Sequence, residues 1–143
     1  MGAAENRRVV EEYIQAINAH DVGRAVSFYA EAGVRDAVGM AVIRGRKDVE
    51  AFYRMTFAAV PDVKLRDLRV MTDEQGAFAE WQESGTNTGT SQMYDGTTVP
   101  RTGRNYNARF AAHFTIRNGQ ITKEHLFVNY LDAFKQLGLL PSR

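Results

Sequence analysis

Residues 106–129, with the sequence YNARFAAHFTIRNGQITKEHLFVN, decide the fold of this chain. Two runs rich in apolar residues flank the pair Asn118-Gly119, and both residues of this pair tolerate the positive φ angles that a type I′ turn requires. The stretch therefore predicts an antiparallel β-hairpin in which Arg117 faces Gln120 across the turn.

Unbroken alternation of side chains gives the two faces of this hairpin different characters. One face is rich in phenylalanine and isoleucine, and it also carries Asn129 and, opposite Ala112, His125. The other face is mixed and carries His113 opposite Glu124. Because a curved sheet buries its more apolar face, we expect His125 and Asn129 to point into the interior and Glu124 to lie on the outer surface.

The residues before the hairpin predict helices followed by strands. Apolar residues recur at helical spacing over 5–18, Asp21 is placed to cap a second short helix, and a third helix begins after Gly45 and ends at Pro61. Strands are expected within 33–43, where a glycine turn joins two of them, and over 63–71, 77–90, 106–117 and 120–129. Helices first and a strand meander afterwards indicate an α+β fold, and 143 residues suit a single domain over 1–143.

The composition excludes several classes of protein. A hydrophobic fraction of 44% supplies a core, and no apolar run is long enough for a membrane helix. Eighteen basic and seventeen acidic residues leave a net charge of +1 without a large basic cluster, so nucleic-acid binding is not expected. The chain has no cysteine, which excludes disulfides and thiolate chemistry. No secretory signal is recognisable, so we expect a cytoplasmic location.

Six segments carry a recognisable pattern. They are INAHD at 17–21, FYAE at 28–31, WQESGTNTG at 81–89, VPRTG at 99–103, RNGQI at 117–121 and FVNYLDAFKQLGLLP at 127–141. Together they resemble the SnoaL-like family of the nuclear-transport-factor-2-like superfamily over nearly the whole chain. The resemblance implies a cone-shaped fold in which three helices pack against a curved, mixed or antiparallel sheet. It also implies a homodimer through the outer sheet face and catalysis without a metal, as in polyketide cyclases and related enzymes that isomerise ketosteroids or open epoxides.

At three positions the chain departs from the pattern of that family. The family's general acid or base is an aspartate seven residues before the glutamine of Gln-Leu-Gly, and this position is Asn129 here. Asn87 stands where relatives often carry histidine, and Ala112 stands where they carry an acidic residue. An amide does not exchange a proton near neutral pH, so either the acid–base chemistry is relocated or the pocket binds its ligand without proton transfer.

Glu83 and His125 are candidates for the relocated acid–base role. Alternation along the strand puts Trp81, Glu83 and Asn87 on one face, and a family-like register turns that face toward the pocket. Burial would raise the pKa of the Glu83 carboxyl toward neutral pH, and the alternative is an exposed or arginine-paired glutamate. An imidazole with an ordinary pKa of about 6.5 suits a proton shuttle at His125, and the alternative is a hydrogen-bonded core histidine.

Other side chains are expected to bind or orient the substrate. Arg35 and Asp36 lie where relatives carry polar pocket residues, and Arg35 would favour a carboxylate or phenolate on the substrate. The alternative for this pair is a surface salt bridge. The remaining candidates, for which ordinary packing or backbone hydrogen bonding is the alternative, are Asn129, Asn87, Trp81, Tyr29, Phe52, Tyr53 and Met55.

No metal and no cofactor is expected, because His20, His113 and His125 lie on separate predicted elements without acidic partners at metal-ligand spacing. We interpret the chain as a cofactor-free cyclase or isomerase for a small, largely apolar substrate of polyketide, terpenoid or steroid type. One alternative is an epoxide-opening enzyme that uses Asp36 and Glu83 as acid and base. The other is a non-catalytic module for ligand binding or dimerisation, which the three neutral substitutions favour.

Overall fold

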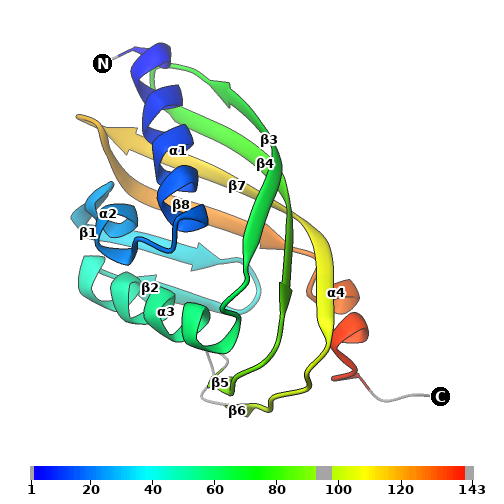
Figure 1. Cartoon of the computed structure of the whole chain (residues 1–143). Coiled ribbons are helices and arrows are strands. Elements are labelled where there is room, and N and C mark those ends of the chain that lie inside the picture. The colour runs from blue at the N-terminus through cyan, green and yellow to red at the C-terminus, as the bar shows by residue number, and fades with distance from the viewer. Residues whose placement is uncertain (1, 93–97, 141–143) are drawn as a thin grey trace.

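The computed structural model of the chain describes residues 2–92 and 98–140 (Figure 1). Its elements are α1 (Ala3–Asn18), α2 (Val22–Ser27), β1 (Tyr29–Ala37), β2 (Ala41–Arg44), α3 (Arg46–Ala59), β3 (Lys64–Thr72), β4 (Gly76–Thr86), β5 (Ser91–Gln92), β6 (Thr98–Val99), β7 (Asn105–Arg117), β8 (Gln120–Val128) and α4 (Tyr130–Leu137). The first three helices and the strands of the main sheet follow the predicted order, while β5, β6 and α4 were not predicted. The α+β fold is confirmed. Pro141, the last residue of the quoted 127–141 segment, lies outside the described residues.

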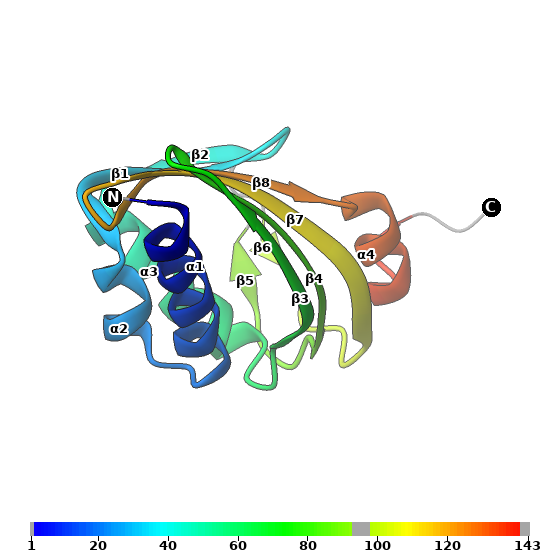
Figure 2. The ribbon, with the colours of Figure 1, turned by 90° about the horizontal axis from the view of Figure 1, so that it is seen from above.

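A mixed six-stranded sheet forms the main layer, with the strand order β2-β1-β8-β7-β4-β3. β1 runs parallel to β8, and the other neighbouring strands are antiparallel. Figure 2 shows the sheet curving around α1, α2 and α3, which lie on its concave side, while α4 follows β8 at the far end. In this view α4 lies beside β7, away from α1, α2 and α3.

Helix α1 packs on the concave side because one of its faces is apolar. Val9, Val10, Tyr13, Ile14 and Ile17 recur at helical spacing, and all five are buried. The helix contacts β3 and α2, so the apolar face closes the hydrophobic core over one end of the sheet.

The predicted starts of the second and third helices are confirmed. The Asp21 side chain accepts a hydrogen bond from the backbone N–H of Arg24 at 3.1 Å and caps α2. Gly45 has a φ of 90° and precedes α3, which ends before Pro61. No helix of residues 2–92 and 98–140 is long and apolar enough to cross a membrane.

The predicted turn between β7 and β8 is confirmed, but the hairpin beyond it is out of register by one residue. Asn118 and Gly119 have φ angles of 52° and 74°, as a type I′ turn requires, and Arg117 faces Gln120. Ile116 faces Ile121, after which a β-bulge leaves Thr122 without an opposite residue in the register, although its hydroxyl donates to the backbone oxygen of Thr115 at 3.2 Å. One extra residue sends every later side chain of β8 to the opposite face.

This bulge reverses the predicted placement of two ionisable side chains. Glu124 pairs with Phe114 and points to the concave side, where 1% of it is exposed. His125 pairs with His113 and lies on the convex face. The expected interior position of His125 and the expected outer position of Glu124 are therefore both wrong, because unbroken alternation was assumed across Thr122.

Candidate active site

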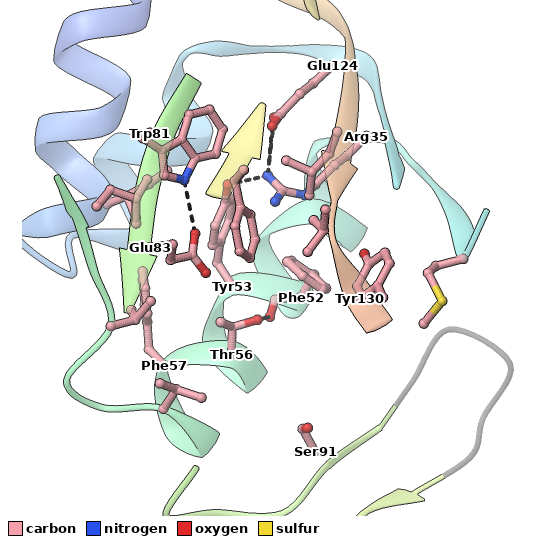
Figure 3. A pocket seen from close by; sticks show the side chains of 18 of the residues that line it. Arg35, Phe52, Tyr53, Thr56, Phe57, Trp81, Glu83, Ser91, Glu124 and Tyr130 are labelled. Carbon is pink, nitrogen blue, oxygen red and sulfur yellow. Dashed lines mark hydrogen bonds and ion pairs between the residues drawn. The ribbon is translucent and has the colours of Figure 1, made fainter. Parts of the chain in front are cut away.

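A cavity of about 220 Å³ lies between the concave face of the sheet and helices α1, α3 and α4. Its walls are mostly apolar and include Ile14, Ile17, Phe57, Leu65, Leu126 and Phe134. Figure 3 shows the polar side chains Glu83, Arg35, Tyr53 and Glu124 among them. Pockets for drug-sized ligands usually measure roughly 300–1,000 Å³, so this cavity suits a smaller ligand of one or two rings.

Glu83, on β4, is held at the cavity wall by two hydrogen bonds. The indole Nε1 of Trp81 donates to its Oε1 at 3.2 Å, and the hydroxyl of Tyr106 donates to its Oε2 at 2.9 Å. Burial raises the pKa of Glu83 above its usual value, although these two hydrogen bonds and the positive charge of Arg35 act in the opposite direction. A carboxyl group with a raised pKa can exchange a proton closer to neutral pH, as a general acid or base must.

Arg35 and Glu124 form a buried ion pair on another wall of the cavity. They are directly paired on the parallel strands β1 and β8, and Arg35 Nη1 lies 3.2 Å from Oε1 and 3.3 Å from Oε2 of Glu124. Burial alone would lower the pKa of Arg35, but the negative charge of Glu124 and the nearby tyrosines raise it well above its usual value. The guanidinium group therefore stays charged inside the protein.

Three tyrosines, Tyr13, Tyr29 and Tyr53, surround this ion pair. The hydroxyls of Tyr29 and Tyr13 donate to Oε1 of Glu124, the latter at 3.1 Å. The hydroxyls of Tyr13 and Tyr53 also share a hydrogen bond, and each accepts one from Arg35 Nη1. Because Tyr13 gives its proton to Glu124, Tyr53 is the donor in the shared bond. Burial raises the pKa of all three tyrosines, so they remain protonated.

Six of the predicted site residues line the cavity: Glu83, Arg35, Trp81, Asn87, Phe52 and Tyr53. The rings of Phe52 and Tyr53 lie over the Arg35 guanidinium carbon, with centroids 5.1 Å and 5.0 Å away. Asn87 is buried, and its Oδ1 accepts a hydrogen bond from the backbone N–H of Thr102 at 2.9 Å. Asn87 therefore lines the cavity while its amide oxygen holds the backbone at Thr102.

Three predicted binding residues have other positions, and the described lining of the cavity includes none of them. Tyr29 is fully buried and reaches Glu124. Met55 lies half-buried on α3. Asn129 is exposed, and its side chain accepts a hydrogen bond from the backbone N–H of Asp132 at 3.1 Å. The expectation that Asn129 points inward is wrong because β8 ends at Val128 and Asn129 caps α4.

The other two predicted catalytic residues, His125 and Asp36, face each other on the convex side of the sheet. They are paired in register on β8 and β1, and His125 Nε2 lies 3.6 Å from Asp36 Oδ2. The imidazole of His113 stacks beside that of His125, with ring centroids 6.3 Å apart. Neither His125 nor Asp36 is among the described residues that line the cavity, so their prediction as groups inside the pocket is wrong. The inward positions next to them on the same strands belong to Arg35 and Glu124.

Sequence reasoning missed Glu124, Tyr13 and Tyr106 as site residues. The signal for Glu124 was the spacing of apolar residues on β8, because Ile121 and Leu126 can share one face only if the strand contains a bulge. Tyr13 lies on the predicted apolar face of α1, where its hydroxyl is not distinguished from ordinary core packing. Tyr106 reaches Glu83 from β7, a pairing that depends on the register of two strands.

The described part of the cavity can hold a small organic molecule and offers one positively charged side chain, Arg35, to an anionic group. No group of three or more histidine, cysteine, aspartate or glutamate side chains among residues 2–92 and 98–140 is arranged to hold a metal ion. The chemistry within reach of these side chains is proton transfer, by Glu83, and stabilisation of negative charge, by Arg35.

The chain is similar in sequence to the SnoaL-like domain family, which matches residues 10–124. No curated protein sequence matches it significantly.

Solved structures with this fold include candidate polyketide cyclases. One from Xanthomonas campestris pv. campestris has a TM-score of 0.82 and 23% identity, with 94% of this chain and 98% of that chain covered. A SnoaL-like one from Jannaschia sp. CCS1 has a TM-score of 0.83 and 15% identity, with 97% and 95% covered. A phenazine biosynthesis-related protein from Pseudomonas aeruginosa has a TM-score of 0.78 and 18% identity, with 98% and 89% covered. At such identities the likeness shows a shared fold.

Proposed function

Because this chain belongs to the SnoaL-like family, we propose that it is a cofactor-independent enzyme of the cyclase or isomerase type in which Glu83 transfers the proton. The proposed substrate is a small, largely apolar molecule of polyketide or terpenoid type, with one or two rings to match a cavity of about 220 Å³. The position of the family aspartate is Asn129 here, which caps α4 outside the described cavity wall, so Glu83 on β4 would supply the acid–base group instead.

In the proposed reaction, the ionised Glu83 removes a proton from a carbon next to a substrate carbonyl. The same carboxyl group returns the proton after ring closure or double-bond migration. The positive charge of Arg35 favours the negative charge that develops on the carbonyl oxygen. The apolar walls hold the substrate in a folded conformation, which brings its reacting atoms together and excludes water.

One observation carries this proposal: Glu83 combines a raised pKa with a place on the cavity wall, and its two hydrogen-bond donors fix the direction of its carboxyl group. Perturbed carboxyl groups in apolar cavities are characteristic of general acids and bases. A glutamate with a structural role alone would not stabilise the fold from this position, because burial destabilises its charged form.

A profile of kcat/KM against pH, over roughly pH 4 to 9, tests the proposal on any polyketide- or terpenoid-like compound that the protein converts. We expect a rise in rate as Glu83 ionises, with a midpoint above pH 4.5, the usual pKa of glutamate. A protein that binds such compounds and converts none of them would be a ligand-binding module instead.

The epoxide-opening alternative paired Glu83 with Asp36 as its acid and base. Asp36 lies beside His125 on the convex face, so this pair does not meet in the cavity. The second carboxyl group on the described cavity wall is Glu124, which is engaged by Arg35, Tyr13 and Tyr29. The geometry therefore favours chemistry that needs one acid–base group.

We also propose that a second copy of the chain covers the convex face of the sheet. Phe78 and Phe127 are 43% and 47% exposed on this face, next to the paired histidines His113 and His125. A sheet face that exposes two phenylalanines favours burial against a partner.

A further inference from the structure

The hydrogen bonds of Arg35 to the described residues all come from one nitrogen of its guanidinium group. Nη1 donates to the hydroxyls of Tyr13 and Tyr53 and to both carboxylate oxygens of Glu124. Nε is buried without a hydrogen-bond partner in this part of the chain. Arginine carries five N–H donors in a planar fork, so the edge formed by Nε and Nη2 has no acceptor among residues 2–92 and 98–140.

The neighbouring hydroxyl donors are already used. Tyr13 and Tyr29 donate to Glu124, and Tyr53 donates to Tyr13. An acceptor that enters this end of the cavity therefore finds uncommitted N–H donors on Arg35, whereas the O–H donors of the three tyrosines are already used. The side chain of Arg35 lines the cavity and is 8% exposed there.

Aromatic rings restrict how such an acceptor can approach. The rings of Phe52 and Tyr53 lie over the guanidinium group, at 5.1 Å and 5.0 Å from its central carbon. The two rings are inclined by 71° to each other, so at most one of them stacks flat on the guanidinium group. An arginine packed against aromatic rings in this way keeps its N–H edge for hydrogen bonds. The Nε–Nη2 edge presents two parallel N–H groups, which is the geometry that a carboxylate accepts in a bidentate manner.

We propose that the Nε–Nη2 edge of Arg35 is a carboxylate subsite, and that the cavity binds an acidic, otherwise apolar ligand of one or two rings. This inference rests on the proposed function in taking the cavity as the substrate site. It adds that the substrate carries a carboxylate, which accepts from the Nε–Nη2 edge and anchors the molecule while its carbonyl group lies near Glu83. Arg35 then acts on that carbonyl oxygen through its charge and not through a hydrogen bond.

A ligand carboxylate changes the net charge inside the cavity and so affects the protonation of Glu83. Glu124 already balances Arg35, so a ligand carboxylate adds a negative charge that no second cation on the described wall offsets. The excess stays at one charge when the acid binds to the protonated form of Glu83, which must then ionise before it removes a proton from the substrate. Burial already raises the pKa of Glu83. A nearby carboxylate raises that pKa further, because two like charges disfavour each other.

Calorimetric titration with 2-naphthoate and its neutral amide, 2-naphthamide, tests the subsite without requiring turnover. For the parent protein we expect naphthoate to bind at least about tenfold more tightly than naphthamide, as one charge-assisted bidentate contact provides. Arg35→Lys keeps the charge and loses the planar edge, so the preference should fall to about twofold or less. Arg54→Lys, on the exposed side of α3, is the matched control and should keep the parent's preference.

A second variant covers the case in which Arg35→Lys does not fold. Arg35→Met combined with Glu124→Gln removes both charges together, avoids an unpaired buried glutamate, and should bind the acid no better than the amide. Equal affinities in the parent, an acid preference that survives both variants, or no binding of either probe at millimolar concentration would each overturn the inference. None of these outcomes bears on Glu83, whose role is tested by turnover, so the two proposals can fail separately.

Discussion

The indole nitrogen of Trp81 and the carboxyl group of Glu83 lie 3.2 Å apart on the same face of β4, two residues from each other along the strand. Alternation of side chains makes this contact possible, because residues i and i+2 point in the same direction. Tyr106 donates to the other carboxylate oxygen from β7. The two donors stabilise the ionised form of Glu83, whereas burial favours the protonated form and outweighs them.

Tyr106→Phe should raise the pKa of Glu83 further, because it removes a donor to the ionised carboxyl group while the burial remains. The midpoint of the profile of kcat/KM against pH should move upward. Tyr130→Phe, which changes another tyrosine on the cavity wall, is the control for loss of a hydroxyl. A midpoint that stays in place or moves downward in Tyr106→Phe would show that this hydrogen bond does not tune Glu83.

The change in the free energy of unfolding that Glu83→Gln causes should be more favourable at alkaline pH than at acid pH. The pKa of Glu83 is raised in the folded state, so its contribution to stability is full below pH 4.5 and is lost as the pH rises through the folded pKa. Glutamine does not ionise, so the free energy of unfolding of the variant does not fall in this way as the pH rises. Urea unfolding at two pH values, below 4.5 and near 8, measures the difference in the free energy of unfolding, with the exposed Glu74→Gln as control. A gain that is equal at both pH values would contradict the raised pKa.

Arg35→Met should lower the free energy of unfolding by about 3–5 kcal/mol, because it leaves the buried Glu124 without its counter-charge. Glu124→Met alone should also lower the free energy of unfolding. The double variant, Arg35→Met with Glu124→Met, should lower it by much less than the sum of the two single effects, since neither charge is then left unpaired. Urea denaturation of the parent and the three variants gives this coupling. Additive losses would mean that the two side chains do not depend on each other for stability.

The first three helices and the β7–β8 turn could be predicted because each depends on residues close together in the sequence. Apolar residues at helical spacing identify α1, and the side chain of Asp21 marks the start of α2. The Asn118-Gly119 pair identifies the β7–β8 turn, because its backbone angles are unusual and few residues tolerate them.

The site was harder to predict because its polar residues meet through strand register. A single bulged residue, Thr122, decides that Glu124 rather than His125 faces the cavity. The partner of Glu124 is Arg35, which lies 89 residues earlier and is reached only because β1 adds to the sheet parallel to β8. Glu83 was predictable because alternation puts it on one strand face with Trp81, and the resemblance to the family turned that face toward the pocket.

Phe127→Asp should convert a dimer into a monomer, because it places a charge within the exposed apolar part of the convex face. Leu131→Asp is the matched control, since Leu131 is 70% exposed on α4 rather than on the sheet. Sedimentation at micromolar concentration distinguishes the two states. A parent protein that sediments as a monomer would contradict the proposed dimer.

The central claim is that Glu83 transfers the proton. Single-turnover conversion by Glu83→Gln, compared with conversion by the parent, tests it most directly. Glutamine keeps the size of the side chain and its hydrogen bond from Trp81 but transfers no proton. We expect the rate of conversion to fall by about 10²–10⁴-fold, while the affinity for the same compound, measured by titration, changes by less than about threefold. Conversion by Glu83→Gln at the parent's rate would show that the proton is transferred by another group and would contradict the account.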